Sequence, residues 1–261
     1  MRFLKKSLGQ NFLIDKNVIN KIISSVEIKN KNVIEIGPGS GALTFEILKK
    51  TPKTLTLIEK DFNLTNKLKE KFIDNKNIKI FNHDILKFDL EKNCKGNSII
   101  FGNLPYNISS QILVKILNFK KWPPKVDDFI FMFQKELGEK IIGKFLSANY
   151  GRLSILTNFR LSLIKKFLVS PNSFFPKPKV TSMVVHFKPK KDELYKLKKI
   201  KNLEKVTNII FSNKRKMINK SIKKILNKRK IEKISNLNLK ARPTEIKPEI
   251  YYKITKLLES S

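Results

Sequence analysis

The stretch Val33–Gly41, VIEIGPGSG, decides the fold because an apolar run passes directly into three closely spaced glycines. The run predicts a buried strand, and Ala42–Lys50 behind the glycines has helical periodicity. Glycines at a strand–turn–helix junction let the backbone come close to a ligand. The spacing is G-x-G-x-G and not the G-x-G-x-x-G of dinucleotide-binding proteins, so a plain tight turn is the alternative interpretation.

Short apolar runs alternate with helical patterns such as Phe62–Phe72 through about residue 190. This alternation predicts a parallel sheet with helices on both faces. Asp15 is expected to cap a helix that follows it, and Ser170–Lys179 is expected to be a proline-rich turn inside an antiparallel edge hairpin. The predicted strands are Asn32–Gly37, Thr54–Ile58, Ile78–Phe81, Ser98–Phe101, Phe129–Phe133, Leu161–Val169 and Val180–Phe187.

The character of the chain changes at a charged linker, Lys188–Asp192. Leu194–Leu258 has helical spacing, many lysines and little strand signal. Within it, Lys214–Lys233 keeps an apolar stripe and predicts an amphipathic helix. We therefore expect an α/β domain over residues 1–189 and a small basic helical domain over residues 190–261.

The charge of the chain is strongly unbalanced, since 55 Lys and Arg face 22 Asp and Glu and leave a net charge of +33. Such an excess favours a nucleic-acid partner over a merely well-solvated surface or a membrane. A single cysteine, Cys94, excludes an internal disulfide, and with only two histidines the chain has no His/Cys metal site. With no signal sequence and no span of about 18 apolar residues, we expect a cytoplasmic, monomeric protein without a metal.

Polar side chains follow three successive predicted strands at their carboxyl ends. Glu59 comes about 20 residues after the glycines, where a carboxylate can accept hydrogen bonds from both ribose hydroxyls. Asp84 could receive an adenine amino group, although a helix cap is an equal interpretation. With Asn103, Gly37 and Gly39, these residues predict one crevice. It fits an adenosine without needing a diphosphate, which favours S-adenosylmethionine over NAD.

The tetrapeptide Asn103–Tyr106, NLPY, follows the fourth predicted strand. The Asn103 side chain and the Pro105 carbonyl could both accept hydrogen bonds from one exocyclic amine. Tyr106 would offer a flat face to the ring that carries this amine. The tetrapeptide therefore predicts a site that holds adenine N6 during methyl transfer.

These motifs resemble those of the ribosomal RNA adenine dimethyltransferases, a family with a small-subunit branch (KsgA) and an antibiotic-resistance branch (Erm). The complete GPGSGALT sequence and the leucine of NLPY resemble the small-subunit branch. The matching segments cover nearly the whole chain in the family's order: Leu8–Leu13, Glu35–Thr44, Asn103–Ser109, Phe174–Val180 and Phe211–Lys216.

The resemblance implies a Rossmann-like class I methyltransferase sheet with a small C-terminal helical domain. It implies that S-adenosylmethionine is used to dimethylate two adjacent adenosines near the 3′ end of 16S rRNA. It adds Asn11 and Leu13 to the cofactor site and places Phe174 on the adenine face opposite Tyr106, although a buried core position for Phe174 is the alternative. The candidate RNA contacts are Lys177, Lys179, Lys214, Arg215 and Lys216.

Three other functions remain open at this point. Large-subunit rRNA methylation, as in the Erm branch, would use the same chemistry. DNA adenine methylation shares the type of catalytic tetrapeptide. A non-catalytic RNA-binding assembly or transcription factor on a relic methyltransferase fold would show its decay first at Asn103 or the glycines, and both are intact.

Overall fold

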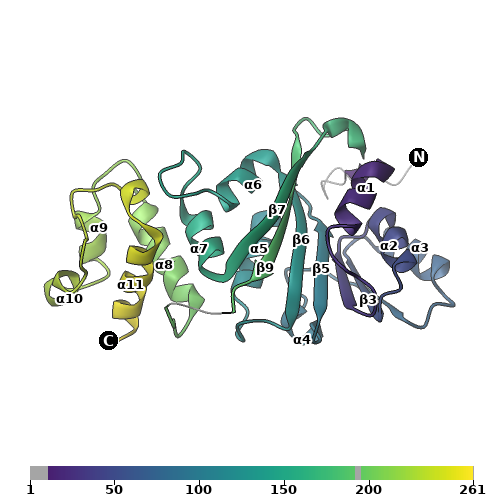
Figure 1. Ribbon diagram of the computed structural model, residues 1–261, viewed down its shortest axis with the longest axis horizontal. Coiled ribbons are helices and arrows are strands. Elements are labelled where there is room, and N and C mark those ends of the chain that lie inside the picture. Colours follow the sequence, from purple (N-terminus) through teal and green to yellow (C-terminus); the bar gives the residue numbers. More distant parts are fainter. Residues whose placement is uncertain (1–10, 192–194, 261) are drawn as a thin grey trace. The chain divides into compact units, whose positions relative to one another are not determined.

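The computed structural model describes residues 11–191 and 195–260, and these fall into two compact units (Figure 1). The first unit holds the described residues up to Gly138 together with Leu163–Pro189, and the second holds Glu139–Ser162 with the described residues from Lys190 onward. The segment Glu139–Ser162, which the sequence placed in the α/β domain, thus groups with the C-terminal helices. Leu8–Gln10 of the N-terminal motif, and Asp192 and Leu194 near the expected boundary, lie outside the described residues.

A seven-stranded sheet forms the centre of the first unit, in the order β4-β3-β2-β5-β6-β9-β7. The first five of these strands are parallel, and β9 joins β6 in antiparallel fashion. The predicted alternating architecture is confirmed, with β9 and β7 as neighbours at the edge. The strands are β2 (Asn32–Ile36), β3 (Thr54–Glu59), β4 (Ile78–Asn82), β5 (Ser98–Asn103), β6 (Val126–Gln134), β7 (Leu161–Val169) and β9 (Ser182–Pro189).

The helices that accompany these strands in the described part of the chain include α1 (Lys16–Ile23), α2 (Ala42–Lys49), α3 (Phe62–Lys71), α4 (Leu90–Asn93) and α5 (Ser109–Leu117). Every second residue of the central strands faces one side of the sheet. On one side Val33, Leu57 and Phe101 join a core cluster with buried residues of α1 and α2 such as Ile22 and Ile47. The cluster thus packs α1 and α2 against this side of the sheet.

The strands β1 (Phe12–Leu13) and β8 (Phe174–Phe175) form a separate two-stranded antiparallel ribbon, which is not part of the large sheet. The predicted proline-rich turn thus contains a short 3₁₀ helix, Pro171–Ser173, and a strand. Asp15 caps α1 as predicted, because one carboxylate oxygen accepts hydrogen bonds from the amides of Asn17 and Val18. Its other oxygen accepts from the Ser173 hydroxyl at 3.0 Å, which ties the two halves of the ribbon together.

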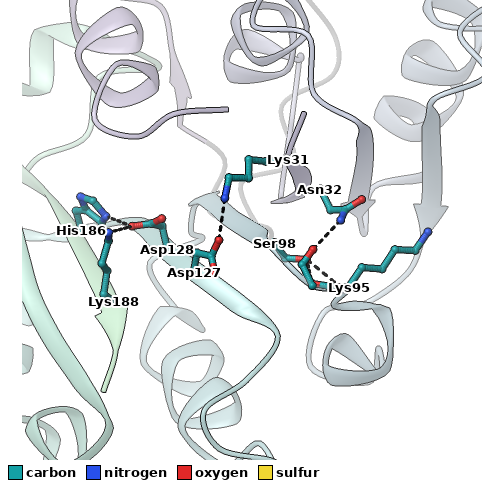
Figure 2. A network of polar contacts seen from close by, with 9 residues as sticks. Lys31, Asn32, Lys95, Ser98, Asp127, Asp128, His186 and Lys188 are labelled. Carbon is teal, nitrogen blue, oxygen red and sulfur yellow. Dashed lines mark hydrogen bonds and ion pairs between the residues drawn. The ribbon is translucent and has the colours of Figure 1, made fainter. Parts of the chain in front are cut away.

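A polar network lies at the amino ends of β2, β5 and β6 (Figure 2). The buried His186 ring contacts Asp128 at 2.7 Å, and Lys188 lies 3.8 Å from the same carboxylate oxygen. Lys31 pairs with Asp127 at 3.0 Å. Since the predicted crevice lies at the carboxyl ends of these strands, this network stabilises the opposite edge of the sheet.

The second unit is helical, and its elements are α7 (Arg152–Arg160), α8 (Ile200–Phe211), α9 (Asn219–Lys223), α10 (Lys228–Glu232) and α11 (Pro248–Glu259); α6 (Lys135–Ile141) crosses from the first unit into it. Tyr150 and Tyr252 explain why Glu139–Ser162 belongs here. The Tyr150 hydroxyl donates to Ile246 O at 2.8 Å, and the Tyr252 hydroxyl donates to Ile155 O at 3.2 Å. Buried hydrogen bonds of this kind leave no pattern in the sequence.

The prediction of a single amphipathic helix over Lys214–Lys233 is wrong. The segment forms the two short helices α9 and α10, and Met217 of the expected apolar stripe is exposed. The Asn227 side chain accepts a hydrogen bond from Lys230 N at 3.0 Å and so starts a new helix within the run. No helix in the described part of the chain is long and apolar enough to cross a membrane.

Candidate active site

One pocket opens at the carboxyl ends of β2, β3, β4 and β5, within the first unit. It is formed by the ribbon strand β1, the glycine turn, the ends of β3 and β4, and the NLPY tetrapeptide. The pocket thus brings together the residues that the sequence placed in one crevice and two that rested on the resemblance. They are Asn11, Leu13, Gly37, Gly39, Glu59, Asp84, Asn103, Pro105 and Tyr106.

The glycine turn depends on backbone conformations that favour glycine. Gly37, Gly39 and Gly41 have φ values of +67°, +59° and +90°, in the left-handed region. A Cβ atom on Gly39 would lie 2.8 Å from a ring carbon of Phe12. The Phe12 ring therefore lies directly against the turn, and glycine is needed there both for conformation and for space.

Glu59 is buried at the end of β3, and its carboxylate already organises the turn. One oxygen accepts a hydrogen bond from Gly39 N at 3.1 Å, and the other accepts from Asp61 N at 2.8 Å. Burial raises the pKa of Glu59, while these backbone hydrogen bonds oppose the rise. A carboxylate has about four acceptor positions, and the amides of Asp61, Gly39 and Lys60 take three of them, so Glu59 can fix the turn and still accept from a ribose hydroxyl.

Glu35 is a site residue whose role was not predicted from the sequence. It is 1% exposed on β2, lines the pocket, and accepts a hydrogen bond from the Thr44 hydroxyl of α2 at 2.7 Å. Burial raises the pKa of Glu35 to about 7, the Thr44 bond opposes the rise, and the charge of Glu59 adds to it. The strand before the glycine turn and the helix after it are thus joined by one side-chain bond.

Asp84 forms an ion pair with Lys60 at 2.9 Å, and its second oxygen accepts from Leu86 N at 2.9 Å. The hydrogen bond from Lys60 lowers the pKa of Asp84, and the Leu86 amide lowers it further. Both predicted roles of Asp84 are compatible with this geometry, since it holds the turn after β4 and lines the pocket. Lys60 and His83 line the pocket as well, although the sequence did not mark them.

Asn103 ends β5 and has a defined orientation. Its side-chain nitrogen donates to Asn11 O at 3.1 Å. The amide oxygen is consequently the group that Asn103 can offer to a donor in the pocket. This arrangement ties the N-terminal ribbon to the predicted amine-binding residue.

Pro105 and Tyr106 follow in a turn whose geometry is fixed by hydrogen bonds. The Pro105 carbonyl accepts from Ile108 N at 3.1 Å and keeps one lone pair for another donor. The Tyr106 hydroxyl lies 2.6 Å from the hydroxyl of Ser182, the first residue of β9. Burial raises the pKa of Tyr106, so the phenol is neutral at ordinary pH. No motif or spacing in the sequence marks the Ser182 contact.

Phe174 differs from the other predicted site residues because it does not line the pocket. Its side chain is 3% exposed and belongs to the core cluster with Leu13, its partner across the ribbon. The neighbouring Phe175 is 48% exposed. Stacking of Phe174 on adenine therefore stays a prediction, and the buried position that the sequence left open is the one observed.

The predicted RNA contacts occupy two separate places. Lys177 and Lys179 are exposed directly after β8 in the first unit. Lys214, Arg215 and Lys216 are exposed in the turn after α8 in the second unit. Among the residues that the structure describes, no group of three or more His, Cys, Asp or Glu could hold a metal ion.

The sheet and the position of the pocket define the class of protein as a Rossmann-like methyltransferase fold, and two solved structures share it. A dimethyladenosine transferase from Plasmodium falciparum superposes with a TM-score of 0.78 at 23% identity, covering 93% of this chain and 95% of that one. The 23S rRNA methyltransferase ErmE superposes with a TM-score of 0.68 at 24% identity, covering 95% of this chain and all of the other. At these identities the likeness shows the fold.

The sequence carries the assignment further than the fold does. The family described as ribosomal RNA adenine dimethylase matches residues 1–260. "Ribosomal RNA small subunit methyltransferase A" of Pelagibacter ubique is 47% identical over 98% of this chain and 97% of its own length. The protein of the same name from Malacoplasma penetrans is 40% identical over 97% of this chain and 91% of its own length. The chain belongs to the ribosomal RNA adenine dimethylase family.

Proposed function

We propose that this protein transfers methyl groups from S-adenosylmethionine to N6 of two adjacent adenosines near the 3′ end of 16S rRNA, during assembly of the small ribosomal subunit. The orientation of Asn103 is the observation that carries the proposal. Because its nitrogen is bonded to Asn11 O, its oxygen is available to an amine hydrogen. Adenine N6 has two such hydrogens, and the names of the Pelagibacter and Malacoplasma relatives specify the small subunit.

The residues around the glycine turn suit the cofactor. The backbone of Gly37 and Gly39 leaves room for close approach, Glu59 presents acceptors at the end of β3, and Asp84 lies at the end of β4. When bound, S-adenosylmethionine supplies a methyl group on a positively charged sulfur, which is an already activated donor. The pocket therefore has to orient the two reactants and does not have to activate the methyl group.

The acceptor presents the harder chemical task, because the lone pair of adenine N6 is delocalised into the ring. Asn103 and the remaining lone pair of the Pro105 carbonyl would accept the two N6 hydrogens and favour a pyramidal nitrogen. Tyr106 would hold the ring plane by stacking. The fixed dipoles stabilise the charge that develops on the nitrogen during attack, and the displaced proton can leave to water.

The basic surface supports an RNA substrate. With a net charge of +33, the protein can hold the phosphates of rRNA through exposed groups such as Lys177 and Lys214. The target adenine has to leave its stack to enter the pocket. The proposed enzyme works as a monomer in the cytoplasm and consumes S-adenosylmethionine without a metal.

Labelled S-adenosylmethionine offered to unmethylated small and large subunits tests the proposal. Dimethyladenosine at paired positions near the small-subunit 3′ end is the expected product. Label confined to large-subunit RNA would move the protein to the Erm type of activity. Tight small-subunit binding without any transfer would instead indicate an assembly factor.

Asn103→Ala tests the mechanism within the same assay. The variant should lose methyl transfer while its affinities for S-adenosylmethionine and for the small subunit change by less than about tenfold, about 1.4 kcal/mol. Asn77→Ala, an exposed asparagine ahead of β4, is the matched control and should keep full activity. Normal turnover by Asn103→Ala would refute the role of this amide.

A further inference from the structure

The β1–β8 ribbon has two faces of opposite character. Leu13 and Phe174 lie opposite each other and face the core, where both are buried. Phe12 and Phe175 form the other cross-strand pair and therefore share the other face. Ile14 continues this face, since its amide is bonded to Ser173 O at 2.9 Å and it lies two residues beyond Phe12.

This second face exposes large apolar side chains beside the pocket. Phe175 is 48% exposed and Ile14 is 57% exposed. Phe12, on the same face, lines the pocket and lies against the Gly39 turn. The face formed by Phe12, Ile14 and Phe175, here called the ribbon face, is thus continuous with the wall of the methyl-transfer pocket.

The charge around the ribbon face is positive. Lys177 and Lys179 are exposed just after Phe175, and residues 170–189 contain no acidic residue. Asp15, which follows Ile14, directs its carboxylate oxygens at the α1 amides and the Ser173 hydroxyl, and the two lysines outnumber this single negative charge. A partner for this surface should combine a flat apolar face with negative charge, and an unstacked nucleotide has both.

We propose that the ribbon face holds the nucleotide that adjoins the target adenosine, with its base stacked on Phe175 and its phosphate near Lys177 or Lys179. This inference rests on the proposed function. Binding of the neighbouring nucleotide by the ribbon would suit a substrate with two adjacent target bases, since one base occupies the pocket while the other is held outside it. Phe175 is then a substrate-positioning residue distinct from the NLPY tetrapeptide.

Steady-state methyl transfer to unmethylated small subunits tests this inference. Phe175→Ala should raise KM for the subunit by about 5- to 150-fold, the range found when an aromatic ring is removed from a stacked base. Phe175→Tyr should keep a KM close to that of the parent, and the dissociation constant for S-adenosylmethionine should not change. Ile73→Ala, a still more exposed apolar residue beyond the end of α3, is the control.

Each other outcome has a definite meaning. An unchanged KM for Phe175→Ala, with the parent active, overturns the inference and leaves the proposed function standing. Weaker cofactor binding with an unchanged KM for the subunit would assign the ribbon face to the cofactor and would also overturn the inference.

A crosslinking experiment gives a second test. Phe175→p-benzoylphenylalanine, irradiated on the small subunit, should attach to RNA next to the dimethylated adenosines. Attachment to a ribosomal protein would contradict the inference. Inactivity of the parent would refute the proposed function itself.

A separate observation concerns Ser182, which is fully buried and lies 2.6 Å from the Tyr106 hydroxyl. Tyr106 belongs to a loop, whereas Ser182 begins β9 opposite Gln134 of β6 and is held by the sheet. We infer that Ser182 is a positioning residue that fixes the plane of the Tyr106 ring for stacking on adenine. It acts through Tyr106 and does not touch the reacting atoms.

A double-mutant cycle separates this role from a general effect on folding. Ser182→Ala should lower kcat about fivefold, as expected for one lost neutral hydrogen bond, and leave KM for S-adenosylmethionine unchanged. In a Tyr106→Phe background, which lacks the hydroxyl, Ser182→Ala should have no further effect on kcat. Equal effects of Ser182→Ala in both backgrounds would refute the inference, and so would an unchanged kcat in the parent background.

Discussion

Glu35→Gln tests the energetic cost of the acid buried between the glycine turn and α2. Glu35 is 1% exposed, and burial raises its pKa from 4.5 to about 7 despite the hydrogen bond from Thr44. Its ionised form is therefore less stable in the folded protein than in the unfolded chain. Glutamine keeps the shape and an oxygen that can accept from Thr44, but it cannot ionise.

The sign and size follow from proton linkage. Because the folded-state pKa is raised, the favourable contribution of Glu35 is fully present below the unfolded-state pKa of 4.5 and is lost as the pH rises to about 7. The complete loss amounts to about 3 kcal/mol, since one pKa unit corresponds to about 1.4 kcal/mol. Between pH 5 and pH 8, the variant should gain about 2–3 kcal/mol in unfolding free energy relative to the parent.

Urea unfolding of both proteins at pH 5 and pH 8 measures this difference. The side-chain N–H groups of glutamine can shift the unfolding free energy by a constant amount. This shift cancels, because only the change between the two pH values is compared. Glu46→Gln, on the same helix as Thr44 but in contact with water, is the matched control for the substitution itself. A difference between variant and parent that is the same at pH 5 and pH 8 would refute the argument that burial raises the pKa of Glu35.

Three further predictions concern the turn, the network and the RNA surface. Gly39→Ala should weaken S-adenosylmethionine binding at least tenfold in calorimetry. The new Cβ would lie 2.8 Å from a ring carbon of Phe12, and the residue would have to keep a φ of +59°. Gly96→Ala is the control and should bind normally, because a Cβ there would have no atom within 4 Å. His186→Leu should lower the unfolding free energy by about 1–3 kcal/mol in urea, because it removes the hydrogen bond to the buried Asp128 and leaves this carboxylate only the longer contact with Lys188, with kcat unchanged. Each residue of Lys214–Lys216 can be replaced by alanine in turn. A replacement that removes a phosphate contact should reduce the slope of log Kd for the small subunit against log salt concentration by about 0.7–0.9.

The sheet and most of the pocket could be predicted from sequence because their signals are local. Each strand is a short apolar run, and the left-handed turn requires glycines at fixed spacing. Glu59, Asp84 and Asn103 could be placed together because the carboxyl ends of parallel strands meet at one edge. Asn11 and Leu13 could be placed in the pocket by resemblance, since nothing in their spacing marks them as ligand contacts.

The contacts that escaped prediction join residues far apart in the chain. Tyr106 meets Ser182 across 76 positions, and Asp15 meets Ser173 across 158. Neither pair has a periodic pattern that could identify it. The error over Lys214–Lys233 has a different cause, because its apolar spacing is truly helical and a cap at Asn227 overrides it locally.

The pair Phe174–Phe175 shows how one unpredictable contact decides a functional assignment. Successive residues of a strand point to opposite faces, so one of the two rings must face inward. Which one does depends on the pairing with Phe12–Leu13, about 160 positions earlier in the chain. In the observed register Phe174 faces the core and is 3% exposed, so its ring does not line the pocket. Phe175 is 48% exposed on the other face of the ribbon, so in this register it is the ring of the pair that a base outside the pocket can contact.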